Sequence, residues 1–140
     1  MSGMVIVGGG QAGYSVASKL RLMGYKGTIK IVCEENSLPY QRPPLSKKFL
    51  LGEISEDRLL FRPENFYKEN DIVIKLGVRV TSIDRSFKSV CCSDGTKISY
   101  KKLFLTTGAV PNYFPEKLGG ALSKIFYIRS TNDIKILDKE

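Results

Sequence analysis

The first strongly patterned stretch of the chain is a short apolar run that ends in glycines. Residues 4–7 are all apolar, residues 8–10 are all glycine, and Gly13 completes the spacing G-x-G-x-x-G. A short, continuous apolar run is typical of a parallel strand whose two faces are both covered. We therefore expect a buried strand, a tight turn and then the start of a helix.

The residues after the glycines continue this pattern into a helix and a second strand. Ala12, Val16 and Leu20 recur every four positions, so we expect them to form the apolar face of the helix. Gly24 is placed to end that helix in a left-handed conformation. Residues 28–33 form a second strand-like run, and together these segments predict a βαβ unit.

This βαβ unit has the features of a dinucleotide-binding motif. Gly8 would allow the tight turn, Gly10 would let a diphosphate approach the backbone, and Gly13 would let helix and strand pack closely. Glu34 follows at about 20 residues from the last glycine, where such motifs place a carboxylate that binds ribose hydroxyls. The alternative is a purely structural glycine turn followed by two solvated glutamates. The agreement of strand, glycines, helix and acid favours the binding motif.

The middle of the chain predicts a stiff loop and a second crossover. Residues 37–50 contain three prolines, which predict an extended loop that becomes a short helix only after Pro44. Residues 63–70 predict another short helix, because a proline is favoured in a first helical turn. Residues 72–76 are apolar except for Lys75 and predict a further parallel strand of the same sheet.

The pattern then changes to alternation of apolar and polar residues, which predicts an antiparallel meander. Its expected strands are residues 78–84, 89–92 and 97–100. Residues 102–109 predict a separate apolar strand that returns to the main sheet and ends in a turn of small residues. Thr131 is expected to cap a final helix over residues 132–139, which the chain end cuts off.

Composition narrows the class of protein. The chain has 140 residues, of which 42% are hydrophobic and 26% charged, values that indicate one globular domain. The net charge of +8 is spread along the chain, so we expect no nucleic-acid partner. No apolar stretch is long enough to predict a membrane span or a signal peptide, and we expect a cytoplasmic protein. Histidine is absent and the three cysteines lack a C-x-x-C spacing; no metal site is expected, and the cysteines read as reduced strand residues.

The glycine stretch and the proline-rich loop together resemble a known family. The segments Gly-Gly-Gly-Gln-Ala-Gly-Tyr and Pro-Tyr-Gln-Arg-Pro-Pro-Leu-Ser-Lys are similar to the N-terminal part of the putidaredoxin and rubredoxin reductases. The resemblance implies an α/β fold, namely a Rossmann-like FAD/NAD(P)-binding domain with a parallel sheet, helices and an antiparallel meander. It also implies that residues 1–140 are the FAD-binding domain, without the nicotinamide-binding and C-terminal interface domains of the family.

The resemblance assigns roles to individual residues. In that family the lysine of Pro-Pro-Leu-Ser-Lys lies beside the flavin, so Lys47 becomes the candidate catalytic residue. Thr106 stands where the family usually has alanine, and the two arginines that often follow that turn are replaced by Val110, Pro111 and Asn112. The predicted cofactor-binding residues are Gly8, Gly10, Gln11, Ala12, Gly13, Glu34, Arg42, Lys47, Val80, Thr107, Gly108 and Arg129.

As the family implies, the complete enzyme would pass electrons from NAD(P)H through FAD to a [2Fe-2S] ferredoxin or a rubredoxin-like acceptor. The chain ends before a second nucleotide-binding motif, so we expect an N-terminal fragment that is not a competent reductase alone. Two alternatives remain at this point. The glycine loop could belong to the NAD-binding domain of a dehydrogenase, or the chain could be a catalytically inactive nucleotide-binding module.

Overall fold

The structure is a computed structural model that describes residues 3–120 and 122–139. These residues divide into two compact units. Unit 1 consists of Met1–Tyr40 and Leu60–Gly108, and unit 2 of Gln41–Leu59 and Ala109–Glu140.

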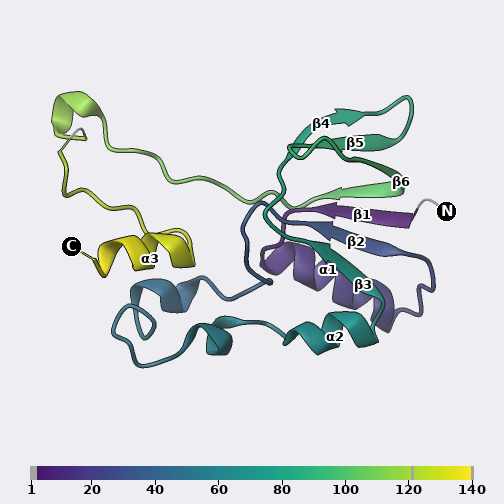
Figure 1. Cartoon of the computed structure of the whole chain (residues 1–140), viewed down its shortest axis with the longest axis horizontal. Coiled ribbons are helices and arrows are strands. Elements are labelled where there is room, and N and C mark those ends of the chain that lie inside the picture. Colours follow the sequence, from purple (N-terminus) through teal and green to yellow (C-terminus); the bar gives the residue numbers. More distant parts are fainter. Residues whose placement is uncertain (1–2, 121, 140) are drawn as a thin grey trace. The chain divides into compact units, whose positions relative to one another are not determined.

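Unit 1 is built from one sheet and two helices (Figure 1). Its strands and helices in chain order are β1 (Gly3–Val7), α1 (Gln11–Leu22), β2 (Ile29–Val32), α2 (Glu64–Glu69), β3 (Ile72–Lys75), β4 (Val80–Asp84), β5 (Ser89–Cys92) and β6 (Lys97–Leu105). The strand order is β3-β2-β1-β6-β5-β4. Neighbouring strands from β3 to β6 are parallel, whereas β6, β5 and β4 pair antiparallel. The predicted α/β fold with its parallel sheet and antiparallel meander is confirmed.

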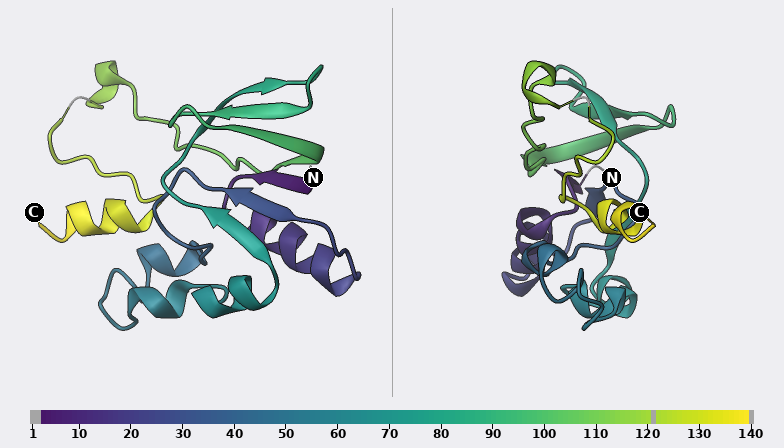
Figure 2. Two further views of the ribbon diagram at one scale, coloured as in Figure 1. Left: turned by 45° about the vertical axis from the view of Figure 1, so that its right-hand side comes forward. Right: turned by 90° about the vertical axis from the view of Figure 1, so that its left-hand side faces the viewer.

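Strand β6 serves both parts of the sheet, which the sequence did not predict. Its first residues pair antiparallel with β5, as in the register Ser89 with Ser99. Its later residues pair parallel with β1, as in Val7 with Leu105. The expectation of two separate strands, at residues 97–100 and 102–109, is therefore wrong. One continuous strand joins the meander to the parallel sheet, with β4 and β5 extending from it (Figure 2).

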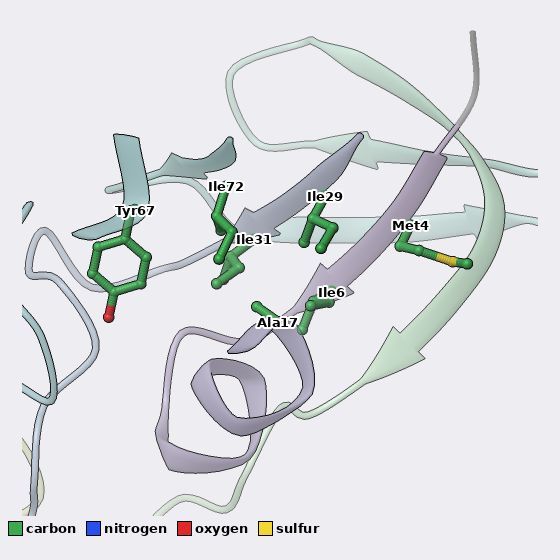
Figure 3. Packing of buried hydrophobic residues seen from close by; sticks show 7 residues of the cluster. All are labelled: Met4, Ile6, Ala17, Ile29, Ile31, Tyr67 and Ile72. Atoms are coloured by element: carbon green, nitrogen blue, oxygen red, sulfur yellow. The ribbon is translucent and has the colours of Figure 1, made fainter. Parts of the chain in front are cut away.

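Both faces of β1 are covered, which explains its uninterrupted apolar sequence, whereas Lys30 of β2 and Val73 of β3 are exposed. Alternate residues such as Ile6 and Ile31 pack with Ala17 of α1 and Tyr67 of α2 on one face (Figure 3). The intervening residues pack on the other face with residues of the meander. This second group consists of Val5, Val7, Val32, Val78, Val90, Cys92 and Tyr100. The sheet therefore forms a rigid base for the loops at its carboxyl edge.

Helix α1 turns a different face to the sheet than the sequence suggested. Gly13 and Ala17 are its buried residues, while Val16 and Leu20 are only partly buried. Ala12, expected on this face, is exposed, because the close approach of the first turn to β1 is made by Gly13 instead. The predicted end of the helix is confirmed: Gly24 has a φ of 80°, and Tyr25 N–H donates to the Leu20 carbonyl at 3.0 Å.

Unit 2 contains short helical segments. They are the 3-10 turns Pro43–Ser46, Glu56–Leu59 and Glu116–Leu118 and the helix α3 (Thr131–Leu137). Helical structure thus starts at Pro43, two residues earlier than expected, because a proline is tolerated in a first turn. Leu45, Leu59 and Ile134 are its buried apolar side chains.

The start of α3 lies one residue earlier than expected. Ser130, not Thr131, is the N-cap: its hydroxyl accepts from Asp133 N–H, and the Asp133 carboxylate accepts from the N-cap backbone. This reciprocal arrangement is a capping box. The helix ends at Leu137 with Asp138 as its C-cap, so the expected extent of residues 132–139 is wrong. Among the described residues, no helix is long and apolar enough to cross a membrane.

Candidate dinucleotide-binding site

Loops from three parallel strands meet at the carboxyl edge of the sheet in unit 1. Gly8 N–H, just after β1, donates to the Val32 carbonyl at the end of β2 at 2.9 Å. Thr106 N–H, just after β6, donates to the Val7 carbonyl at 2.9 Å. In open α/β sheets ligands bind at this edge. The structure thus brings the predicted glycine loop together with the segments that carry Glu34 and Thr107.

Two of the motif glycines are required by the fold itself. Gly8 has a φ of +110°, and a Cβ there would lie 2.2 Å from the Thr106 carbonyl oxygen. A Cβ at Gly13 would lie 2.1 Å from the Gly8 carbonyl oxygen. Both contacts are with backbone, so a side chain could be accommodated only by moving the strand or the helix. These glycines set the tight turn and the close packing that the sequence predicted.

Gly10 is different, because nothing in the part of the chain that the structure describes requires it to be glycine. Its φ of −81° and ψ of −169° suit any residue, and a Cβ there would meet no atom within 4 Å. It is the N-cap of α1, so it leaves the first N–H groups of the helix, at Gln11, Ala12 and Gly13, without a capping side chain. The open space lies at the positive end of the helix dipole, where helices bind anionic groups such as a diphosphate.

Thr106 holds the glycine turn through its side chain, a role that sequence reasoning missed. Its hydroxyl lies 3.0 Å from the Val7 carbonyl oxygen and 3.0 Å from the Gly8 carbonyl oxygen. The hydroxyl can donate its proton to either acceptor. The only signal in the sequence was the departure from the alanine usual in the resembling family, which does not by itself indicate a hydrogen bond.

Glu34 lies beside the glycine loop and forms an ion pair. A side chain at Gly9 would lie 2.4 Å from the Sγ of Cys33, so the residue before Glu34 is packed against the loop. Glu34 Oε1 accepts from Nη1 of Arg79 at 2.8 Å, and both side chains are about two-thirds exposed, at 63% and 67%. Arg79 is a second residue that sequence reasoning missed, because an exposed arginine between two strands carries no pattern.

The remaining candidates of unit 1 are Val80, Thr107 and Gly108. Val80 begins β4, and its side chain packs against the apolar cluster of the meander. Thr107 and Gly108 come after Thr106, which follows β6, and are exposed. Gly108 has a φ of 69°, a conformation that favours glycine.

Two of the three candidates of unit 2, Arg42 and Arg129, are in contact with each other. The Arg42 guanidinium donates to the Arg129 carbonyl oxygen, so it helps to hold the segment that leads into α3. Burial opposes ionisation of Asp133. However, hydrogen bonds from the Ser130 and Arg129 N–H groups and the Ser130 hydroxyl lower the pKa of this carboxyl below its usual range. Lys47 is exposed after the proline turn.

The three cysteines are free thiols, and Cys33 lies just after β2 rather than in a strand as expected. Cys33 and Cys92 are buried and Cys91 is half-buried. Cys91 and Cys92 are consecutive residues of β5, so their side chains point to opposite faces of the sheet. They are therefore not arranged as a redox pair.

Fold and site together define a dinucleotide-binding α/β unit of the kind found in flavin- and nicotinamide-dependent oxidoreductases. The family model described as pyridine nucleotide-disulphide oxidoreductase matches residues 2–140. The chain belongs to this family.

Relatives within the family are similar over nearly the whole chain. Rubredoxin-NAD(+) reductase of Pseudomonas putida is 44% identical over 137 residues, which cover 98% of this chain and 35% of the relative. The crystal structure of the covalent putidaredoxin reductase–putidaredoxin complex superposes with a TM-score of 0.90 at 34% identity, covering 99% of this chain and 34% of that one. A ferredoxin reductase for the CYP199A2 system from Rhodopseudomonas palustris gives 0.89 at 35% identity, covering 99% of this chain and 34% of that one. The chain therefore spans about a third of the length of these relatives.

Proposed function

We propose that this chain is the FAD-binding part of an NAD(P)H-dependent ferredoxin or rubredoxin reductase. The observation that carries the proposal is the open space at Gly10, at the start of α1, where the fold has no need of a glycine. A glycine retained beside free helix N–H groups is explained by a ligand that approaches the backbone closely.

The residues of unit 1 would bind the ADP portion of the cofactor. The first N–H groups of α1 would donate to the diphosphate. Glu34 would accept hydrogen bonds from the ribose hydroxyls through the carboxylate oxygen that does not contact Arg79. Thr107 and Gly108 would line the approach to the cofactor from β6, and Val80 would border the adenosine end.

The family resemblance implies roles at the flavin for three further candidates. Lys47 would lie beside the isoalloxazine ring, and Arg129 and Arg42 would contribute positive charge near its polar edge. Bound FAD would supply the hydride-accepting and one-electron chemistry. In the complete protein, electrons would come from NAD(P)H and leave to an iron-sulfur protein or a rubredoxin, in the manner that the names of the relatives describe.

A binding titration tests the proposal and separates FAD from NAD. FAD and NADH contain the same ADP group, so Glu34 and the glycine loop alone would serve either. The chain is titrated into FAD, FMN and NADH, with binding followed by the fluorescence of each ligand. We expect FAD to bind at one per chain, ADP to displace it, and FMN to bind at least tenfold more weakly. Tighter binding of NADH than FAD would favour the dehydrogenase alternative, and no binding of either would contradict the proposal.

A pair of matched variants tests the role of Glu34. Glu34 and Glu64 are both exposed and each forms one ion pair, Glu34 with Arg79 at 2.8 Å and Glu64 with Lys68 at 2.9 Å. Glu34→Gln should weaken FAD binding roughly tenfold, because a hydrogen bond to a charged acceptor is replaced by a weaker one. Glu64→Gln, with the same loss of charge, should leave the affinity unchanged.

A further inference from the structure

We infer that Arg79 is a positioning residue for the nucleotide site, and that it orients the Glu34 carboxylate for the ribose. This inference rests on the proposed function. The observation behind it is the contact of one guanidinium nitrogen, Nη1, with one carboxylate oxygen, Oε1, at 2.8 Å. Such a contact leaves the second carboxylate oxygen able to accept hydrogen bonds.

The backbone beside Glu34 fixes where Arg79 stands. Val78 N–H donates to the Cys33 carbonyl at 2.9 Å, and Gly77 N–H donates to the Glu35 carbonyl at 3.2 Å. The residues on either side of Glu34 are thus tied to the segment immediately before Arg79. The ion pair therefore joins two side chains whose backbones already lie side by side.

The other side of Arg79 is held by the turn between β5 and β6. Arg79 N–H donates to the Ser93 hydroxyl at 3.1 Å, and Ser93 N–H donates back to the Arg79 carbonyl at 2.8 Å. The same turn is anchored to β3, because Lys75 Nζ lies 2.7 Å from Oδ2 of Asp94. Arg79 thus projects its guanidinium from a backbone that is fixed on both sides.

The presence of this ion pair is not explained by a contribution to the folding stability of the chain. Both side chains are about two-thirds exposed, at 63% and 67%, and exposed pairs contribute little to folding free energy. A free glutamate at this position would sample several rotamers and would lose that freedom when it binds a ribose. A guanidinium that already holds the carboxylate lowers this loss. Arg79 contacts only Oε1 of Glu34 in this ion pair, so the other carboxylate oxygen can still accept a hydrogen bond from the ribose.

The test compares ADP with 2′,3′-dideoxy-ADP, because the ratio of their affinities reports only on recognition of the ribose hydroxyls. Both ligands carry the same charge, so a general effect of Arg79 on anions cancels in the ratio. Affinities for the full chain are measured by isothermal titration calorimetry. We expect the wild-type chain to bind ADP about tenfold more tightly than the dideoxy compound. Arg79→Gln should reduce this preference to about threefold or less, and Arg79→Lys should retain most of it.

Arg85→Gln is the matched control. Arg85 is also an exposed arginine in the meander, after β4, and its loss should leave the preference unchanged. An unchanged preference in Arg79→Gln would overturn the inference while the proposed function stands. An increased preference would also overturn it, since Arg79 would then compete with the ribose. A wild-type chain that binds ADP without preference, or not at all, would contradict the ribose role of Glu34 and the inference with it.

Discussion

The hydroxyl of Thr106 lies 3.0 Å from the carbonyl oxygen of Gly8, so the residue that follows β6 also holds the glycine turn. The same hydroxyl reaches the Val7 carbonyl at 3.0 Å. These contacts join two segments that are almost one hundred positions apart, with separations of 98 and 99 residues. The shape of the candidate site therefore depends on β6 as well as on the βαβ unit.

Replacing this hydroxyl should destabilise the chain. Thr106→Val keeps the shape of the side chain but removes the donor, and we expect it to lower the free energy of unfolding by about 1 kcal/mol. Thr106→Ser keeps the donor, so its free energy of unfolding should be close to that of the wild type. Urea denaturation followed by far-UV circular dichroism measures both. A Thr106→Val variant as stable as the wild type would show that the hydroxyl does not hold the turn.

The glycines of the motif should separate into two classes on mutation to alanine. Gly13→Ala places a Cβ 2.1 Å from the Gly8 carbonyl oxygen, so we expect a loss of stability of about 1–3 kcal/mol. Gly10→Ala meets no atom within 4 Å, so the variant should fold normally but bind FAD at least tenfold more weakly. Thermal unfolding and flavin titration of both variants test this. Normal FAD affinity in a folded Gly10→Ala variant would show that the diphosphate does not bind at this position.

Arg21 should be important for the stability of unit 1. Its guanidinium donates four hydrogen bonds, to the carbonyl oxygens of Tyr25, Gly27, Asn70 and Asp71 at 2.6, 2.8, 2.6 and 2.8 Å. These contacts tie the loop after α1 to the loop after α2. Arg21→Met should lower the free energy of unfolding by about 2 kcal/mol, because hydrogen bonds to a charged donor are among the stronger ones. The neighbouring basic residue Lys19 is exposed, and Lys19→Met should have little effect in the same denaturation experiment.

The capping box of α3 should make its stability depend on pH. The pKa of Asp133 is lowered in the folded chain, so the unfolded chain binds the proton more readily as pH falls. The stabilisation is therefore present above the usual aspartate pKa of about 3.9 and is lost as pH falls below it through the folded pKa. Amide hydrogen exchange of the α3 residues, corrected for the intrinsic effect of pH, should show protection decreasing in that range.

A matched variant shows whether Asp133 is the group responsible. Asp133→Asn cannot titrate, so its α3 protection should be lower at neutral pH and should change little on acidification. Loss of a cap of this kind costs about 0.5–2 kcal/mol. The same pH dependence in both proteins would assign the effect to another group.

Sequence patterns correctly predicted those features that depend on residues close together in the sequence. The apolar run of β1 and the glycine after α1 follow from burial on both faces and from backbone conformation. The continuity of β6 was not predictable, because it depends on pairing with β1 and β5 at once. The buried face of α1 was wrong by one position, since the close approach of Gly13 to Gly8 decides it. Thr106 and Arg79 were missed as site residues because their partners are distant in sequence.

Hydrogen exchange with and without FAD tests the central claim most directly, because it locates the bound cofactor on the chain. The full chain is exchanged in deuterated buffer alone and with saturating FAD, and deuterium uptake is measured for peptides along the sequence. We predict slower exchange in residues 8–14, which span the glycine turn and the start of α1, and in residues 33–36, just after β2, and unchanged exchange in α2. Protection that leaves residues 8–14 unaffected, or no protection at all, would contradict the assignment of the dinucleotide site to the carboxyl edge of the sheet.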